Sequence, residues 1–170
     1  MNLYHLTVPQ FDKALQSVER WIDKTTEYAK TKKFDANDLL VARLAPDQFS
    51  LVKQIQIVCD NAKMVPARLS GKEAPAHPDT EKTWDELRTR VRAVREYVNG
   101  FKPADFEGAE ERLVSLPWMP GKVLTGRDYV TDFAIANFYF HLTTAYSILR
   151  HNGVELGKMD FILSLPFKDA

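Results

Sequence analysis

Residues 129–151, YVTDFAIANFYFHLTTAYSILRH, decide the fold of this 170-residue chain. Coiled as a helix, this stretch places apolar side chains around nearly its whole circumference, and such a helix belongs in the centre of a structure. Residues 125–128, TGRD, can cap its start, and Asn152-Gly153 can end it. The stretch therefore predicts a last helix that is packed against several others.

Three more segments have the periodicity of amphipathic helices. They run from about Pro9 to Lys32, from just after Ala45-Pro46-Asp47 to Gly71, and from Thr80 or Thr83 to Asn99. Pro66 predicts a kink or a break in the second segment, because it removes one backbone hydrogen bond. Between Asn99 and Gly126 the periodicity disappears, and a short hairpin or an extended crossover is expected. The chain is thus predicted to be all-α: one domain over 1–170, a four-helix bundle with a long crossover before the last helix.

Composition excludes several classes of protein. The chain has 23 basic and 23 acidic residues, and this balance argues against nucleic-acid binding, which depends on clustered Lys and Arg. The single cysteine, Cys59, cannot form an intrachain disulfide. The first residues lack the pattern of a secretory signal, and no apolar run approaches 18 residues, so no membrane span is expected. These features predict a cytoplasmic protein.

Polar residues interrupt the apolar seam of the last helix. Its 4-3-4 spacing predicts that Asn137, His141 and Thr144 face the core. An unpartnered buried polar group costs about 1–3 kcal/mol, so all three need partners. On the second helix, Gln56 and Asp60 lie one position past the apolar seam, and we expect them to face His141.

Three interpretations of this predicted cluster stay open. It can be a hydrogen-bonded cluster that fixes helix register, a pocket without a metal, or a metal site in which His141 is a ligand. A zinc site normally needs three or four His, Cys or acidic ligands. The evident set here is His141 and Asp60 alone.

The third helix carries four arginines, Arg88, Arg90, Arg92 and Arg95, beside its apolar stripe. Acidic residues are interleaved with them, so a solvated helix face is expected rather than a basic binding patch.

Several stretches together resemble the DinB/YfiT-like superfamily, and in particular a group of bacterial proteins of unknown function. They are RLAPDQF (43–49), QIQIVCDNAK (54–63), ARLSG (67–71), TWDEL (83–87), GAEERLV (108–114) and NFYFHLTTAYSILRHNGVELGK (137–158). The resemblance implies an up-down-down-up four-helix bundle that is commonly dimeric. Relatives bind zinc or nickel through one histidine on the second helix and a His-x-x-x-His pair on the last, and some are thiol-dependent transferases or isomerases.

Only one of these three ligands has a counterpart here. His141 falls at the second histidine of the pair, Asn137 stands at the first, and residues 47–71 contain no histidine near Gln56. Asp60 is a possible substitute ligand. The resemblance thus implies a degenerate metal site, zinc or nickel being the metals concerned.

Three functions are therefore expected as alternatives. The first is a DinB-like bundle whose polar core pocket binds a small molecule or serves the fold; its residues are Gln56, Asp60, Asn137, His141 and Thr144. The second is a metal-dependent enzyme such as a thiol-dependent transferase, with His141 as a ligand. The third is a homodimeric interaction protein.

Overall fold

A computed structural model describes residues 2–169, and helices dominate it. In chain order the elements are α1 (Leu3–Lys32), the 3-10 helix η1 (Ala36–Val41), α2 (Leu51–Ser70), α3 (Trp84–Asn99), the 3-10 helix η2 (Pro103–Phe106), β1 (Leu113–Ser115), β2 (Val123–Thr125), α4 (Gly126–Asp128), the π-helical segment η3 (Tyr129–Ala134), α5 (Ile135–His151) and α6 (Lys158–Ile162).

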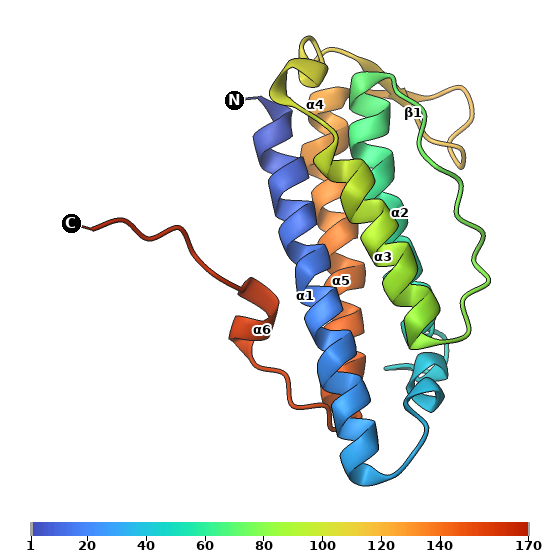
Figure 1. The fold of residues 1–170 in the computed structure, drawn as a ribbon. Coiled ribbons are helices and arrows are strands. Elements are labelled where there is room, and N and C mark those ends of the chain that lie inside the picture. Colours follow the sequence, from blue (N-terminus) through green and yellow to red (C-terminus); the bar gives the residue numbers. More distant parts are fainter. Residues whose placement is uncertain (1, 170) are drawn as a thin grey trace.

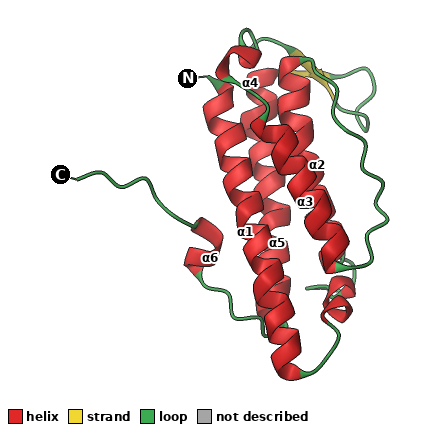
Figure 2. Ribbon diagram, viewed as in Figure 1, coloured by secondary structure: helices red, strands yellow, loops and turns green. Residues whose placement is uncertain are grey.

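Helices α1, α2, α3 and α5 form the predicted up-down-down-up four-helix bundle (Figure 1). Helices α2 and α3 are parallel to each other and antiparallel to α1 and α5 (Figure 1). Residues 72–83 make this possible, because they run along the bundle from the end of α2 to the start of α3 without a helix or strand (Figure 2). The connection 100–125 stays near one end of the bundle (Figure 1).

Helix α1 begins six residues before the position expected from the sequence. The Asn2 side chain accepts a hydrogen bond from Tyr4 N (2.9 Å) and caps the helix, so Pro9 lies inside it rather than in its first turn. The extra turns bury Leu3 and Val8, which offsets the backbone hydrogen bond that Pro9 cannot make.

Helix α2 passes through Pro66 without a break. Pro66 is buried four residues before the helix ends at Ser70, so the missing hydrogen bond affects only the end of the helix. Helix α3 starts with the capping box that its sequence indicates: Glu86 N donates to Thr83 Oγ1 (3.2 Å), and Thr83 N donates to the Glu86 carboxylate (3.0 Å).

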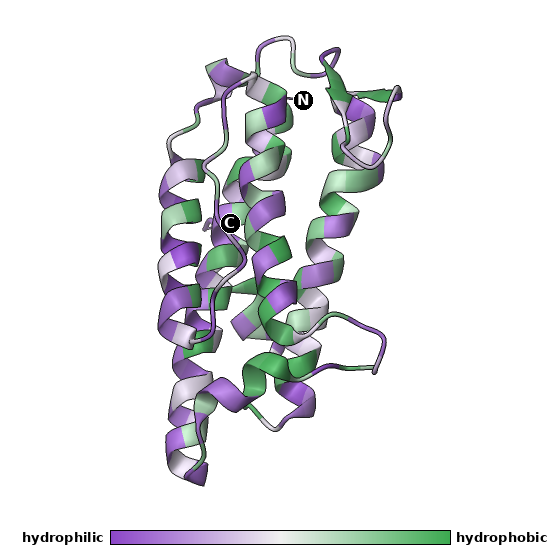
Figure 3. Ribbon diagram, turned by 90° about the vertical axis from the view of Figure 1, so that its right-hand side faces the viewer, coloured by the Kyte–Doolittle hydropathy of each residue, from purple (hydrophilic) through white to green (hydrophobic). Residues whose placement is uncertain are grey.

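The connection before the last helix contains the short hairpin expected there. Strands β1 and β2 are antiparallel, with Leu113 opposite Thr125 and Ser115 opposite Val123. Both strands are largely hydrophobic (Figure 3). Gly126 then begins α4, which is followed directly by η3 and α5. A Cβ atom at Gly126 would lie 1.9 Å from the Ala109 carbonyl oxygen, so only glycine fits.

Helix α5 packs mainly against α2, and its inner residues are fully buried. The Phe138 ring lies 4.2 Å from the Phe11 ring of α1, centroid to centroid. The expectation of a helix enclosed on all sides is wrong, because Ala136, Phe140 and Thr143 are exposed. Within residues 2–169, no helix is both long and apolar enough to cross a membrane.

Candidate functional site

His141 pairs with Gln54 of α2. Only 8% of His141 and 2% of Gln54 is exposed, and His141 Nδ1 lies 2.7 Å from Gln54 Oε1. The amide oxygen can only accept, so Nδ1 carries the proton. Gln54 Nε2 in turn donates to the Phe49 carbonyl (3.1 Å). Burial lowers the pKa of His141, so this contact holds a neutral imidazole.

Asn137 makes a second cross-helix pair one turn away. Its Nδ2 donates to Asn61 Oδ1 (3.0 Å), and Asn61 Nδ2 donates to the Ile57 carbonyl (3.0 Å). Both asparagines are half-buried. We call the four residues Gln54, Asn61, Asn137 and His141 the α2–α5 seam. Thr144 is buried but does not join the seam, because its hydroxyl donates to the carbonyl of Phe140 (2.7 Å) in its own helix.

Gln56 and Asp60 do not face His141, contrary to expectation. Gln56 Nε2 donates to Glu81 Oε2 (2.8 Å), and Asp60 Oδ1 accepts from Arg90 Nη2 (2.8 Å). The reason is the rotation of the helix. Gln54 and Asn61 are seven residues, or about two turns, apart and share the side toward α5, whereas positions 56 and 60 lie on the side toward α3. The five predicted pocket residues are thus divided between two faces of the bundle.

The face toward α3 holds a cluster of charges around Arg90, whose side chain is 2% exposed. Arg90 Nη1 lies 2.8 Å from Asp79 Oδ1 and 3.1 Å from Glu81 Oε1, and Nη2 contacts Asp60. Burial opposes ionisation of Asp79 and Glu81, but hydrogen bonds, including those from Arg90, outweigh it and hold the pKa of each carboxyl below its usual value.

Lys63 extends this cluster. Its ammonium, on a side chain 6% exposed, lies 2.9 Å from Asp60 Oδ1 and 3.0 Å from His77 Nδ1. Burial, together with the charges of Lys63 and Arg90, lowers the pKa of His77. We call Asp60, Lys63, Asp79, Glu81 and Arg90 the ionic cluster. Cys59 is buried close by, and burial raises its pKa to about 12, so it is a thiol rather than a nucleophile.

The ionic cluster differs from the expectation that all four α3 arginines lie on a solvated face. That expectation holds for Arg92, which is 64% exposed, and is wrong for Arg90. The available signal was the position of Arg90, three residues after Leu87 and four before Val94, both members of the buried stripe. The acidic pair at 79 and 81 in the preceding loop supplied the counter-charges.

The residues at the seam do not fit a zinc or nickel centre. His141 is the one imidazole among the four seam residues, and the other three are amides, which are not among the usual protein ligands of zinc. Across the described chain, no group of three or more His, Cys, Asp or Glu residues is placed to hold a metal ion. His141 therefore has no partner ligands here, and Asp60 does not supply one.

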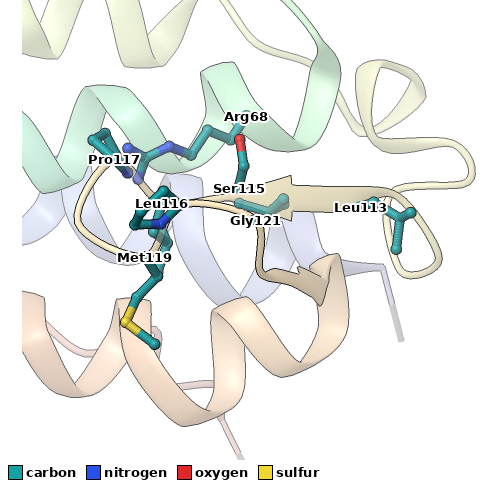
Figure 4. A pocket seen from close by; sticks show the side chains of 9 residues that line it. Arg68, Leu113, Ser115, Leu116, Pro117, Met119 and Gly121 are labelled. Carbon is teal, nitrogen blue, oxygen red and sulfur yellow. The ribbon is translucent and has the colours of Figure 1, made fainter.

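A cavity of about 520 Å³ lies elsewhere, between the last turns of α2 and the β1–β2 hairpin. Its lining residues are Arg68, Gly121 and residues 113–117, 119 and 120. Figure 4 shows the Arg68 side chain extending from α2 toward Leu116 and Pro117. Arg68 Nη1 donates to the hydroxyl of buried Tyr129 (2.9 Å), and its guanidinium carbon lies 5.6 Å from the centre of that ring.

The helix order, the hairpin and the seam between the second and last long helices define a bundle of the DinB type. The chain matches the model of DUF1993, a domain of unknown function, over residues 3–162 and belongs to this family. It is similar to a crystal structure of a DinB family member protein from Shewanella denitrificans, with 49% identity and a TM-score of 0.95. That similarity covers 99% of this chain and 96% of the other. The comparison with curated proteins gave no match.

Proposed function

We propose that the protein is a small-molecule-binding bundle that works without a resident zinc or nickel ion. A contrast between two sites supports this function. In the α2–α5 seam the polar groups bond to one another, as in the pair of His141 with Gln54 at 2.7 Å. Beside Arg68, by contrast, about 520 Å³ of open space is lined by polar and apolar side chains, a volume in the range of small-molecule sites.

In this proposal the seam has a structural role. A buried polar pair between two helices has few alternative partners, so it fixes how α2 and α5 align along their axes. The pocket expected around His141 is thus replaced by a hydrogen-bonded contact, and ligand binding takes place at the other end of α2.

Metal content tests the first half of this proposal. Protein purified without a histidine tag or chelator, and then dialysed against zinc and nickel, is expected to hold far less than one ion per chain by elemental analysis. About one ion per chain in the wild type, lost in His141→Ala, would overturn the proposal and restore the metalloenzyme alternative.

A ligand screen tests the second half. Mixtures of small neutral and charged fragments, followed by amide NMR spectra, are expected to shift the resonances of residues 113–121 while leaving those of 54–61 in place. Shifts confined to the seam, or none at all, would contradict binding at the hairpin cavity.

Self-association is a second candidate, and the outer side of α5 favours it. Residues 133–149 contain no Asp, Glu, Lys or Arg, yet this helix reaches the surface at Ala136, Phe140 and Thr143. Phe140 is 57% exposed. Depletion of charge with an aromatic residue at the centre is typical of interface cores, and two copies of this side can meet without repulsion between like charges.

Light scattering after size exclusion tests this candidate. A homodimer is expected for the wild type, and Phe140→Glu is expected to yield a monomer. Val41→Glu, which alters a residue 73% exposed on η1, is the matched control and leaves the dimer intact. A monomeric wild type at about 100 μM would eliminate this candidate, because the dissociation constant of a stable dimer lies well below that concentration.

A further inference from the structure

The cavity beside Arg68 combines a cation with an apolar wall. Leu116, Pro117, Met119 and Pro120 line it from the loop between β1 and β2, and the Ser115 hydroxyl lies at the same surface. No Asp or Glu is among the residues that line it. The one formal charge in the lining is therefore the positive charge of Arg68.

Arg68 differs from the other arginines that are not fully exposed. Arg88, Arg90 and Arg95 each have a carboxylate oxygen within 4.0 Å, whereas no salt bridge to Arg68 exists within residues 2–169. Its one hydrogen bond within that range is to the neutral phenol of Tyr129. A half-buried guanidinium without a counter-charge is electrostatically incomplete, since burial removes part of the water that would otherwise stabilise the charge.

Tyr129 sets the orientation of this guanidinium. It is fully buried in η3, accepts a hydrogen bond from Nη1, and its ring lies against the guanidinium. Because the hydrogen bond to Tyr129 uses Nη1, the edge formed by Nε and Nη2 is left intact for a ligand. Two neighbouring N–H groups on one planar edge match the two oxygens of a carboxylate.

We propose that this cavity binds a small organic carboxylate. The carboxylate pairs with the free edge of Arg68, and the apolar part of the molecule lies against Leu116, Pro117 and Met119. A phosphate group fits less well, because its charge and three oxygens call for more donors than one guanidinium edge, and six of the nine lining residues are apolar. This inference rests on the proposed small-molecule function and assigns it a ligand class.

The experiment is an amide NMR titration with sodium benzoate and sodium octanoate. Benzamide, the neutral analogue of benzoate, and inorganic phosphate serve as comparison probes. The two carboxylates are expected to shift residues 113–121 at concentrations at least tenfold below those at which benzamide or phosphate does so.

Variants then test the role of Arg68. Arg68→Gln is expected to weaken carboxylate binding at least tenfold, and Arg68→Lys to weaken it less, because the charge stays but the planar edge is lost. Arg20→Gln, at an exposed arginine of α1, is the matched control and leaves binding unchanged. Ser115→Phe places a bulky ring in the lining of the cavity without altering Arg68, and it is expected to abolish binding. It serves as the second test should Arg68→Gln fold poorly.

Two results overturn the inference. One is carboxylate binding of equal strength in the wild type and in folded Arg68→Gln. The other is binding of benzamide at residues 113–121 with no preference for carboxylates, which would leave the small-molecule function standing and remove the assigned ligand class. Absence of any shift at 113–121 with every probe and fragment would reject both proposals together.

Discussion

Helix α2 has two polar faces, and they satisfy their buried groups in different ways. Toward α5, neutral groups pair one to one: imidazole with amide and amide with amide. Toward α3, one guanidinium contacts three carboxylates, two of which belong to the loop 72–83. The first face aligns two helices, whereas the second fixes in place a loop that has no regular secondary structure. The ionic cluster is thus part of what allows α2 and α3 to run parallel.

The two faces should therefore respond differently to mutation. Removing a neutral partner leaves one dipole unpaired. Removing Arg90 takes one cation away from three carboxylates, of which Asp60 still has Lys63 beside it and Glu81, only 10% exposed, loses its ion pair. Removal of the cation is expected to have the largest effect on stability.

Arg90→Met is expected to lower the free energy of unfolding by about 3 kcal/mol, the lower end for breaking a buried ion pair. The lower end applies because Asp60 and Asp79 keep 38% and 34% of their side-chain area exposed. Denaturant unfolding measures the loss, and hydrogen exchange at 72–83 should rise with it. Arg92→Met, at a side chain 64% exposed, is the control and should cost less than about 1 kcal/mol. Equal losses in the two variants would mean that the ionic cluster does not hold the loop.

His141→Ala is expected to cost about 1–3 kcal/mol, because Gln54 Oε1 loses its donor in a site where neither residue is more than 8% exposed. Thr144→Val is the matched control on the same helix: its hydroxyl bonds only to its own backbone, so the change should stay within about 0.5 kcal/mol. Urea unfolding of both variants measures the difference. A stable His141→Ala protein that loses a bound metal would instead place His141 in a metal site.

The sequence was sufficient for the bundle because its signals are local and repeated. The four long helices follow from apolar periodicity, and the Thr83–Glu86 capping box is present where its residues indicate. Helix α6 is different: its five residues have no strong pattern, and it is held by tertiary hydrogen bonds such as Trp21 Nε1 to the Asp160 carbonyl (2.9 Å). The start of α1 differs from the position expected near Pro9, because the Asn2 side chain caps the helix and Pro9 lies inside it.

The site was harder to predict, because assigning a polar residue to a face requires knowing how the helix is rotated. Apolar spacing defines the middle of the buried stripe of α2 but not which neighbouring helix each edge contacts. Gln54 and Gln56 are only two residues apart, yet they contact α5 and the loop before α3 respectively. The regular seam of their own helix predicts that Asn137 and His141 face the core, but it does not identify Asn61 and Gln54 as their partners.

Acidification should reduce stability through both faces. Burial lowers the pKa of His141, and burial with nearby positive charge lowers that of His77, so both are protonated more readily in the unfolded chain, where a histidine pKa is near 6.5. Their contribution is therefore complete above about pH 6.5 and is lost as the pH falls through the lower folded values. The pKa values of Asp79 and Glu81 are also lowered, so a further loss follows below their unfolded values of 3.8 and 4.5.

Urea midpoints between pH 8 and pH 5 measure the histidine part of this dependence. Each histidine can add at most about 1.4 kcal/mol per pH unit. His141→Gln should remove the histidine contribution of the α2–α5 seam, and His77→Gln that of the contact between His77 and Lys63. A slope that persists unchanged in the double variant would assign the pH dependence to other groups.

The smallest expected effect concerns Asn61 and Asn137, and it tests how the seam works. Each single Asn→Leu change should cost about 0.5–1.5 kcal/mol, because the remaining half-buried amide loses its partner but can still reach water. The double variant should be close to the wild type, since two leucines can pack against each other where two amides had bonded. A double-mutant cycle from urea unfolding should thus give a coupling of at least about 0.5 kcal/mol. Additive losses would show that the pair contributes no mutual stabilisation, leaving His141 and Gln54 as the contact that aligns α2 with α5.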